Sequence, residues 1–176
     1  MTGLPKRALL WFAVTVVGLA LFSLGSFALV ARGVAVREAG EGTALRVAGL
    51  DFTVDDASTA DVLELPGERR EAAGAYGVVR LAAANGGDRP GRVPFYAFRL
   101  VDQHGRLYAP ANVSARASGE QGDSFAVQTG QSRDVTLVFN VAADSTPAWL
   151  EIVDPAAGSR ALYGPAFAVA ARWRLR

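Results

Sequence analysis

The side chains that most often carry enzyme chemistry are scarce in this sequence. The 176 residues include one histidine, His104, one lysine, Lys6, and no cysteine. A Ser-His-Asp triad would have to use His104, but the nearest match to a nucleophile elbow, GQSRD at 130–134, lacks the second glycine. One histidine without cysteine is too little for an ordinary zinc site, and Lys6 directly precedes an apolar segment, which rules out a P-loop. The sequence therefore predicts a protein that is not an enzyme and holds no cofactor or metal.

Carboxylates are the remaining groups with possible chemistry. Asp51, Asp55, Asp56 and Asp61 cluster in a stretch, 51–61, that reads as a loop, and Ca²⁺ prefers oxygen ligands of this kind. Their spacing matches no EF-hand loop, and solvated acidic residues are common in loops. A glycosidase would need two opposed carboxylates in a cleft, which spacing along a chain does not test. Calcium binding and an enzyme that uses carboxylates alone stay as weaker alternatives.

A row of arginines ends the chain. Arg172, Arg174 and Arg176 alternate with Trp173 and Leu175, so in a strand the arginines share one face. On an ordinary edge strand, that face would simply lie in water. The functional interpretation is a contact with lipid headgroups or an acidic partner, because guanidinium binds phosphate and carboxylate through paired hydrogen bonds. A formal net charge of +1 gives no field that would favour nucleic acid.

A long apolar segment precedes all of these residues. Residues 8–31 (ALLWFAVTVVGLALFSLGSFALVA) are 24 positions without a charge. As a helix they would span roughly 36 Å, against about 30 Å of bilayer hydrocarbon. The apolar core of a cleaved signal peptide is shorter, about 7–15 residues, although 26–28 (SFA) leaves cleavage open as an alternative. We predict a retained transmembrane helix at 8–31 behind a short cytoplasmic tail at 1–7.

Small residues gather on one side of this predicted helix. At about 100° per residue, Thr15, Gly18, Gly25 and Ser26 fall within about a third of the circumference. Small residues let helices approach closely in lipid, although they are also simply common in membrane helices. The seam predicts packing against other membrane proteins. The short tail before the helix favours a signal anchor with the C-terminal domain in the periplasm or outside the cell.

The region after the helix has the pattern of a β domain. Residues 32–42 (RGVAVREAGEG) read as a linker, and period-two alternation begins at Thr43. The stretch Asp55–Arg70 is the least strand-like and is expected to be a loop or a helical turn. Strands separated by Gly-, Asn-, Asp- and Pro-rich turns predict an all-β sandwich over 43–176. We expect strands at 45–47, 52–54, 74–84, 94–101, 106–108, 133–141, 148–153 and 162–175.

The same alternation predicts the centre of the core. A shift of one residue in register would turn each side chain to the opposite face, so their burial tests the strand assignment. The expected core residues are Phe98, Leu100, Val135, Leu137, Phe139 and Trp149.

Two runs carry a resemblance to a known family, FRLVDQHGRLYAP at 98–110 and TGQSRDVTLVFNVAADSTPAWLEI at 129–152. The first contains a D-x-x-G-x-x-Y hairpin, and the second a strand introduced by a glycine. The residues that match are Asp102, Gly105 and Tyr108 in the first run, and Gly130, Val138, Phe139 and Val141 in the second.

Over residues 43–153, the chain resembles the telokin-like, immunoglobulin-like domain of unknown function found in bacterial exported and membrane-anchored proteins. It departs from that family at Asn140, where aspartate is usual, and at Ala143, where proline is common. The resemblance implies an immunoglobulin-like β-sandwich outside the cytoplasm, often behind a lipid or helix anchor. It implies no enzymatic activity.

Together, these observations predict a non-enzymatic, single-pass membrane accessory subunit. Its helix would pack against other subunits of a transport, respiratory or photosynthetic complex, and its sandwich would cover or bridge their exported face. The alternative is a free-standing envelope module that binds a small ligand or a cell-envelope component.

Overall fold

The computed structural model describes residues 36–153 and 169–176. Across these two ranges, no helix is both long enough and apolar enough to cross a membrane. The predicted transmembrane segment, 8–31, and the tail before it lie outside the described residues. The start of the last expected strand, 162–168, lies outside them as well.

The described chain is almost entirely strand and turn. Its two helical elements are short, the 3₁₀ turn η1 (Phe95–Ala97) and the helix α2 (Val113–Ala117). The strands are β1 (Arg37–Gly40), β2 (Leu45–Val47), β3 (Leu50–Leu65), β4 (Glu68–Ala84), β5 (Gly91–Pro94), β6 (Phe98–Asp102), β7 (Leu107–Tyr108), β8 (Ser124–Val127), β9 (Ser132–Val141), β10 (Pro147–Val153) and β11 (Val169–Arg174).

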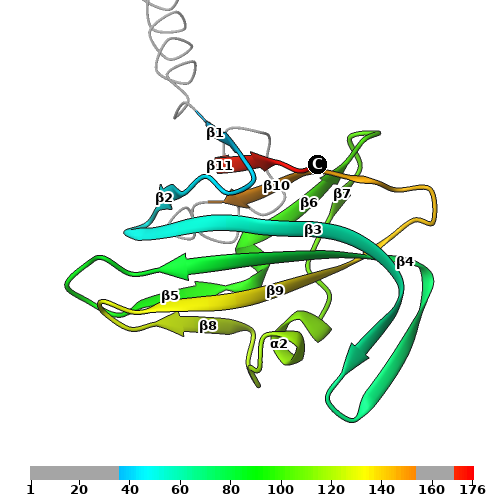
Figure 1. Cartoon of the computed structure of the whole chain (residues 1–176), viewed down its shortest axis with the longest axis horizontal. Coiled ribbons are helices and arrows are strands. Elements are labelled where there is room, and N and C mark those ends of the chain that lie inside the picture. The colour runs from blue at the N-terminus through cyan, green and yellow to red at the C-terminus, as the bar shows by residue number, and fades with distance from the viewer. Residues whose placement is uncertain (1–35, 154–168) are drawn as a thin grey trace, which may run out of the picture. The chain divides into compact units, whose positions relative to one another are not determined.

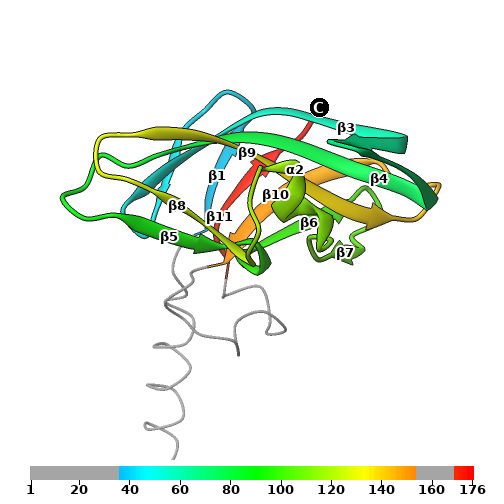
Figure 2. The same cartoon turned by 90° about the horizontal axis from the view of Figure 1, so that it is seen from below.

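The strands form a β-sandwich, which confirms the predicted all-β class. One sheet has the order β1-β11-β10-β6-β7, the other has the order β2-β3-β4-β9, and β5 pairs with β8 in a separate ribbon. Figure 1 shows the β3–β4 hairpin and β9 side by side across the front, with β10 and β11 behind them. In Figure 2 the strands of the two main sheets run in clearly different directions.

The core lies between the two main sheets, where alternate side chains of each strand meet. Five of the six predicted core residues are at most 1 % exposed, namely Phe98, Leu100, Val135, Leu137 and Phe139. Trp149 is the exception, because it lies on the outer face of β10 and is partly exposed. The indole that fills the core is that of Trp173, which is fully buried and donates from Nε1 to the carbonyl of Thr43 at 2.9 Å.

A glycine makes room for the centre of this core. Gly77 on β4 pairs with Phe139 on β9, and a Cβ atom built on Gly77 would lie 2.7 Å from Cδ2 of Leu100. A contact under 3 Å requires movement, so Gly77 permits the close approach of the two sheets here.

The stretch Asp55–Arg70 is a hairpin, and the prediction of a loop or helical turn was wrong. β3 and β4 pair from Asp51 with Ala84 to Leu65 with Glu68, and the hairpin extends past the other strands (Figure 1). Its turn contains Pro66-Gly67, with Gly67 at φ +76°, a left-handed conformation that glycine adopts readily. The prediction failed because this arm is largely solvated and lacks the apolar alternation of a half-buried strand.

Two other boundaries differ from the prediction. Arg37–Gly40, inside the predicted linker 32–42, form β1, which runs parallel to β11. This strand is polar and is held by backbone pairing. Because it has no alternating apolar residues, the hydrophobic pattern did not reveal it. The expected strand 94–101 is interrupted by η1, whose Phe95 N–H donates to the carbonyl of Asp123 at 2.8 Å instead of continuing a ladder.

The short helix α2 covers the outer face and the edge of β9. Val113 packs with Leu63 and with Val138, which is completely buried. The Ser114 hydroxyl donates to the Val138 carbonyl at 3.0 Å and accepts from the Val138 N–H at 2.9 Å. Ser118 makes the same pair of hydrogen bonds with Thr136, at 2.9 and 3.0 Å. Serine hydroxyls therefore occupy the backbone groups that a further strand would use.

Candidate functional site

The D-x-x-G-x-x-Y hairpin forms a closed polar cluster around Asp102. Oδ1 of Asp102 accepts from the backbone N–H groups of His104 at 2.9 Å and Arg106 at 2.8 Å. Oδ2 accepts from Nε of Arg106 at 2.6 Å, from the Ser145 hydroxyl at 2.9 Å and from the Tyr108 hydroxyl at 3.2 Å. Gly105, at φ +77°, supplies the left-handed turn that lets the chain wrap around this carboxylate.

The pKa shifts of Asp102 and Arg106 agree with this closed arrangement. Burial of Asp102 acts to raise its pKa, but hydrogen bonds from Arg106, Ser145 and His104 outweigh that effect and hold the pKa well below its usual range. Arg106 donates hydrogen bonds to the carboxylates of Asp144 and Asp102, and these bonds raise the pKa of Arg106 in turn. A carboxylate with every acceptor site in use is a poor general base, so the cluster is a fold-stabilising contact between the β6–β7 turn and the loop before β10.

His104 takes no part in a triad. Its side chain is exposed, and its Nε2 lies 3.0 Å from Nε2 of Gln103 and 3.9 Å from Oδ2 of Asp144. The Ser145 hydroxyl bonds to Asp102 and Tyr108 without an imidazole between them. His104 is thus an exposed residue of the β6–β7 turn.

The acidic stretch at 51–61 belongs to β3 and its hairpin. The β3–β4 pairing is irregular at two places, between Val54 and Asp56 and between Ala60 and Val62. Neither irregularity brings the carboxylates of β3 together. In the portions of the chain that the structure describes, no three histidine, cysteine, aspartate or glutamate side chains converge as metal ligands. The calcium alternative was based on a loop at 51–61, and this stretch is a strand instead.

The C-terminal arginines alternate with buried residues as predicted, but β11 is not an edge strand. It lies between β1 and β10, and Trp173 and Leu175 point into the core. Arg172 bridges to Glu38 of β1, whereas Arg174 and Arg176 are exposed. β1 was the element missing from the prediction, and it turns the supposed edge into an interior strand.

Arg172 and Arg174 converge on the indole of Trp149. Their Cζ atoms lie 4.5 Å and 5.8 Å from the centroid of the Trp149 ring. Register explains the contact, because Trp149 pairs with Arg174 and Glu151 pairs with Arg172 across β10 and β11. Nε of Arg172 is buried and has no hydrogen-bond partner within the described residues. We call Trp149, Arg172 and Arg174 the tryptophan–arginine face.

Arg176 does not join this face through its side chain. Its backbone N–H donates to Oε1 of Glu41 at 3.0 Å, which ties the C-terminus to the turn after β1. The predicted row of three arginines is therefore a pair on Trp149 followed by a separate terminal residue. The small-residue seam at Thr15, Gly18, Gly25 and Ser26 lies outside the described residues.

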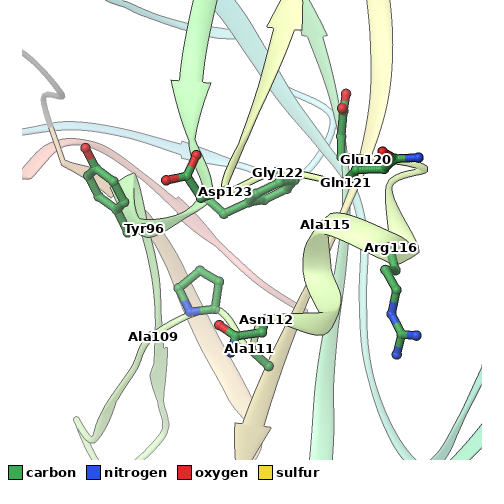
Figure 3. A pocket seen from close by; sticks show the side chains of 12 residues that line it. Tyr96, Ala109, Ala111, Asn112, Ala115, Arg116, Glu120, Gln121, Gly122 and Asp123 are labelled. Carbon is green, nitrogen blue, oxygen red and sulfur yellow. The ribbon is translucent and has the colours of Figure 1, made fainter.

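A groove of about 530 Å³ lies beside η1 and α2. Three segments line it, η1 with the exposed ring of Tyr96, the stretch 109–116, and the loop 120–123. Figure 3 shows Tyr96 and Asp123 next to each other on one side, Glu120 and Gln121 on the other, and Asn112 between them. Tyr96 is 52 % exposed, which is high for a large aromatic side chain in a protein with this much buried core.

The polar groups of the groove are of two kinds. Arg116 bonds to Glu68 at 2.6 Å and Glu120 bonds to Arg133 at 2.5 Å, so both are already in ion pairs. The Asn112 side chain makes no capping hydrogen bond to α2. Within the described residues, the Asp123 carboxylate likewise has no ion-pair partner. The groove thus combines an apolar floor with polar side chains that are free to bind.

Sequence reasoning identified Arg172 and Arg174 but missed their contact with Trp149, and it missed the groove entirely. The tryptophan–arginine face depends on β10 lying beside β11 in one register, and Trp149 was expected inside. The groove depends on β5–β8 pairing, which brings η1 next to the loop 120–123 and has no strong local signal. The only hint in the sequence is the glycine-containing run SGEQGD at 118–123, which marks a loop but not its neighbours.

Several solved structures share the fold of this chain. The chain aligns with a secreted protein from Mycobacterium tuberculosis, MPT63, at 14% identity and a TM-score of 0.54, over 79% of this chain and 97% of that one. It aligns with the yjhA protein from Bacillus subtilis at 12% identity and a TM-score of 0.55, over 78% and 99%. An uncharacterized β-sandwich protein from Clostridium difficile 630 aligns at 11% identity and a TM-score of 0.50, over 80% and 95%. These likenesses show a shared β-sandwich.

No curated protein matches the chain. A family model does match, over residues 40–162, and its description is a domain of unknown function, DUF4352. The match covers the Asp102 hairpin and β9, the two runs on which the predicted resemblance rests, and that prediction is confirmed. The chain belongs to the DUF4352 family of domains of unknown function.

Proposed function

We propose that this protein is a non-enzymatic, membrane-anchored module of the cell envelope that binds an acidic surface of other membrane protein subunits. The observation that carries this proposal is the tryptophan–arginine face, where two guanidinium groups lie against one partly exposed indole. Tryptophan and arginine are the residues most enriched at the energetic centres of protein interfaces. Stacking also holds each guanidinium in place before a partner arrives, which reduces the entropy lost on binding.

The anchor in this proposal is the apolar segment 8–31, with the sandwich on the exported side. Its length is the support for a span, and the small residues on one side provide a surface for another helix. The fold shared with a secreted mycobacterial protein supports an exported domain.

Purification of the full-length protein in a mild detergent, followed by mass spectrometry, tests this function. The wild type should co-purify with a membrane subunit, and Trp149→Ala or Arg174→Glu should release it. Added salt should weaken the association, because exposed charges are screened. Leu107→Ala is the matched control, since Leu107 is 60 % exposed on β7 and lies outside the tryptophan–arginine face. Equal recovery of the subunit with all three variants would contradict the proposal.

The helix seam is tested in the same preparation. Gly18→Leu or Gly25→Leu should force neighbouring helices apart and weaken the assembly. Leu24→Ala lies on the far side of the predicted helix from the seam and should matter less. If both glycine variants keep every partner, the seam faces lipid and the sandwich alone carries the interaction.

The second candidate function is a free-standing module that binds a small ligand or an envelope component. The groove at Tyr96 favours it, because unpaired polar side chains around an apolar floor are what small-molecule sites provide. A lone monomer after mild purification would support this candidate over the first.

A further inference from the structure

The groove at Tyr96 is preformed. The loop 120–123 is tied at one end by the Phe95 N–H, which donates to the Asp123 carbonyl at 2.8 Å. At the other end, the Glu120 N–H donates to the Ala115 carbonyl at 2.7 Å, and the Glu120 side chain pairs with Arg133. Both walls are thus fixed by hydrogen bonds to regular elements, which lowers the conformational cost of holding a ligand.

We propose that this groove binds a short segment of a neutral glycan. A pyranose ring has an apolar C–H face and an edge of hydroxyl groups. The exposed ring of Tyr96 offers a flat apolar surface for the first, and the amide of Asn112 and the carboxylate of Asp123 offer planar hydrogen-bonding groups for the second (Figure 3). Small side chains on the floor, such as Ala111 and Ala115, leave room for the ring.

The charges of the groove exclude anionic ligands. Arg116 is the cation among the described lining residues, and it is held by Glu68 at 2.6 Å. In Figure 3 its side chain points away from the other labelled groups. The exposed carboxylate of Asp123 would repel a phosphate or a carboxylate. A ligand that presents neutral hydroxyl and amide groups meets no such penalty.

A peptide fits the groove less well than a glycan. Extended peptides usually bind by adding a strand to an open sheet edge. The edge of β9 beside α2 is already occupied, because the Ala111 N–H donates to the Val138 carbonyl at 2.7 Å and the hydroxyls of Ser114 and Ser118 fill the adjacent positions. Strand addition is therefore blocked along this part of β9, and the lining of the groove offers side-chain contacts, which suit a sugar.

The proposal deepens the second candidate function and does not depend on the tryptophan–arginine face. The test uses the full-length protein in a detergent without a sugar headgroup, titrated calorimetrically with neutral tetrasaccharides. The probes are β-1,4-linked N-acetylglucosamine, α-1,4-linked glucose and α-1,6-linked mannose. At least one should bind, Tyr96→Ala should weaken it at least tenfold, and Tyr96→Phe should retain most of the affinity. Asp123→Asn should weaken binding several-fold.

Two matched controls separate this site from the rest of the molecule. Leu107→Ala removes an exposed apolar side chain outside the groove, and Trp149→Ala disrupts the tryptophan–arginine face. Both should leave glycan affinity unchanged. Absence of binding to all three glycans, equal affinity in wild type and Tyr96→Ala, or full displacement of the glycan by a tetraproline peptide would overturn the proposal. None of these results bears on the partner released by Trp149→Ala, so the two proposals fail separately.

Discussion

The Asp102 cluster and the groove at Tyr96 are built from the same kinds of side chain, yet they differ in how those side chains are used. Asp102 is buried and accepts five hydrogen bonds, two from backbone N–H groups and three from side chains. Asp123 is exposed, and only its backbone carbonyl is engaged within the described residues. A carboxylate whose acceptors are all in use stabilises the fold, whereas one whose acceptors are free is available to a ligand.

Paired aspartate substitutions give the largest expected difference. Asp102→Ala should lower the free energy of unfolding by about 3 kcal/mol, because it leaves the backbone N–H groups of His104 and Arg106 and two hydroxyls without their buried acceptor. Asp123→Ala should change it by less than about 0.5 kcal/mol, as is usual for exposed positions. Urea denaturation followed by circular dichroism measures both values. Similar losses at the two positions would remove the distinction.

Loss of the Ser114 hydroxyl should have a smaller effect. Ser114→Ala leaves the N–H of buried Val138 without its partner and should cost about 1–3 kcal/mol. Ser124→Ala, at a buried serine whose hydroxyl accepts from exposed Arg92, should cost less. Chemical denaturation of both variants provides the comparison, and a reversed order would contradict the role assigned to Ser114.

The loss of folding stability at acid pH should depend on Asp102. Its pKa is about 3.9 in an unfolded chain and well below that in the folded protein, so the unfolded state takes up the proton first as the pH falls. Stabilisation by this carboxylate is therefore complete above about pH 5 and is lost towards the folded-state pKa, by at most about 1.4 kcal/mol per pH unit. Asp102→Asn should flatten this slope between pH 2.5 and 4.5. An unchanged slope in urea titrations at these pH values would argue against the assignment.

A pair of tyrosine substitutions gives the smallest expected difference. Tyr108→Phe removes a hydroxyl that lies 2.8 Å from Oγ of Ser145 and 3.2 Å from Oδ2 of Asp102, and should cost about 1 kcal/mol. Tyr96→Phe removes a hydroxyl on an exposed ring and should leave the midpoint of thermal unfolding unchanged. Differential scanning calorimetry resolves a difference of this size. A larger loss at Tyr96 would mean that its hydroxyl has a structural partner.

The fold was predictable where apolar residues alternate, and not where the backbone or polar side chains hold the structure. The period-two pattern placed Val135, Leu137 and Phe139 in the core, and the D-x-x-G-x-x-Y hairpin was recognised from three residues. The pattern could not reveal β1, which has no apolar face, or the solvated arm around Pro66 and Gly67. It also placed Trp149 in the core wrongly, because its neighbours Ala148 and Leu150 are both apolar and mark no polar face.

The candidate sites were less predictable, because each depends on which strands become neighbours. The arginines at 172 and 174 were identified from their alternation, but their contact with Trp149 requires the pairing of β10 with β11. The groove requires β5 to pair with β8, which brings Tyr96 next to Asp123 although they are 27 positions apart. Neither pairing follows from local propensity. The sequence alone therefore predicted the arginines of the tryptophan–arginine face. It did not predict where in the fold either site lies.

The serines of α2 have a consequence for aggregation. The outermost strand of a sheet is a template on which a second chain can grow, and fibrils lengthen in that way. Ser114 and Ser118 already hold the donors and acceptors of Thr136 and Val138 on β9. Along this part of β9, another chain is thereby denied a starting point for cross-β stacking.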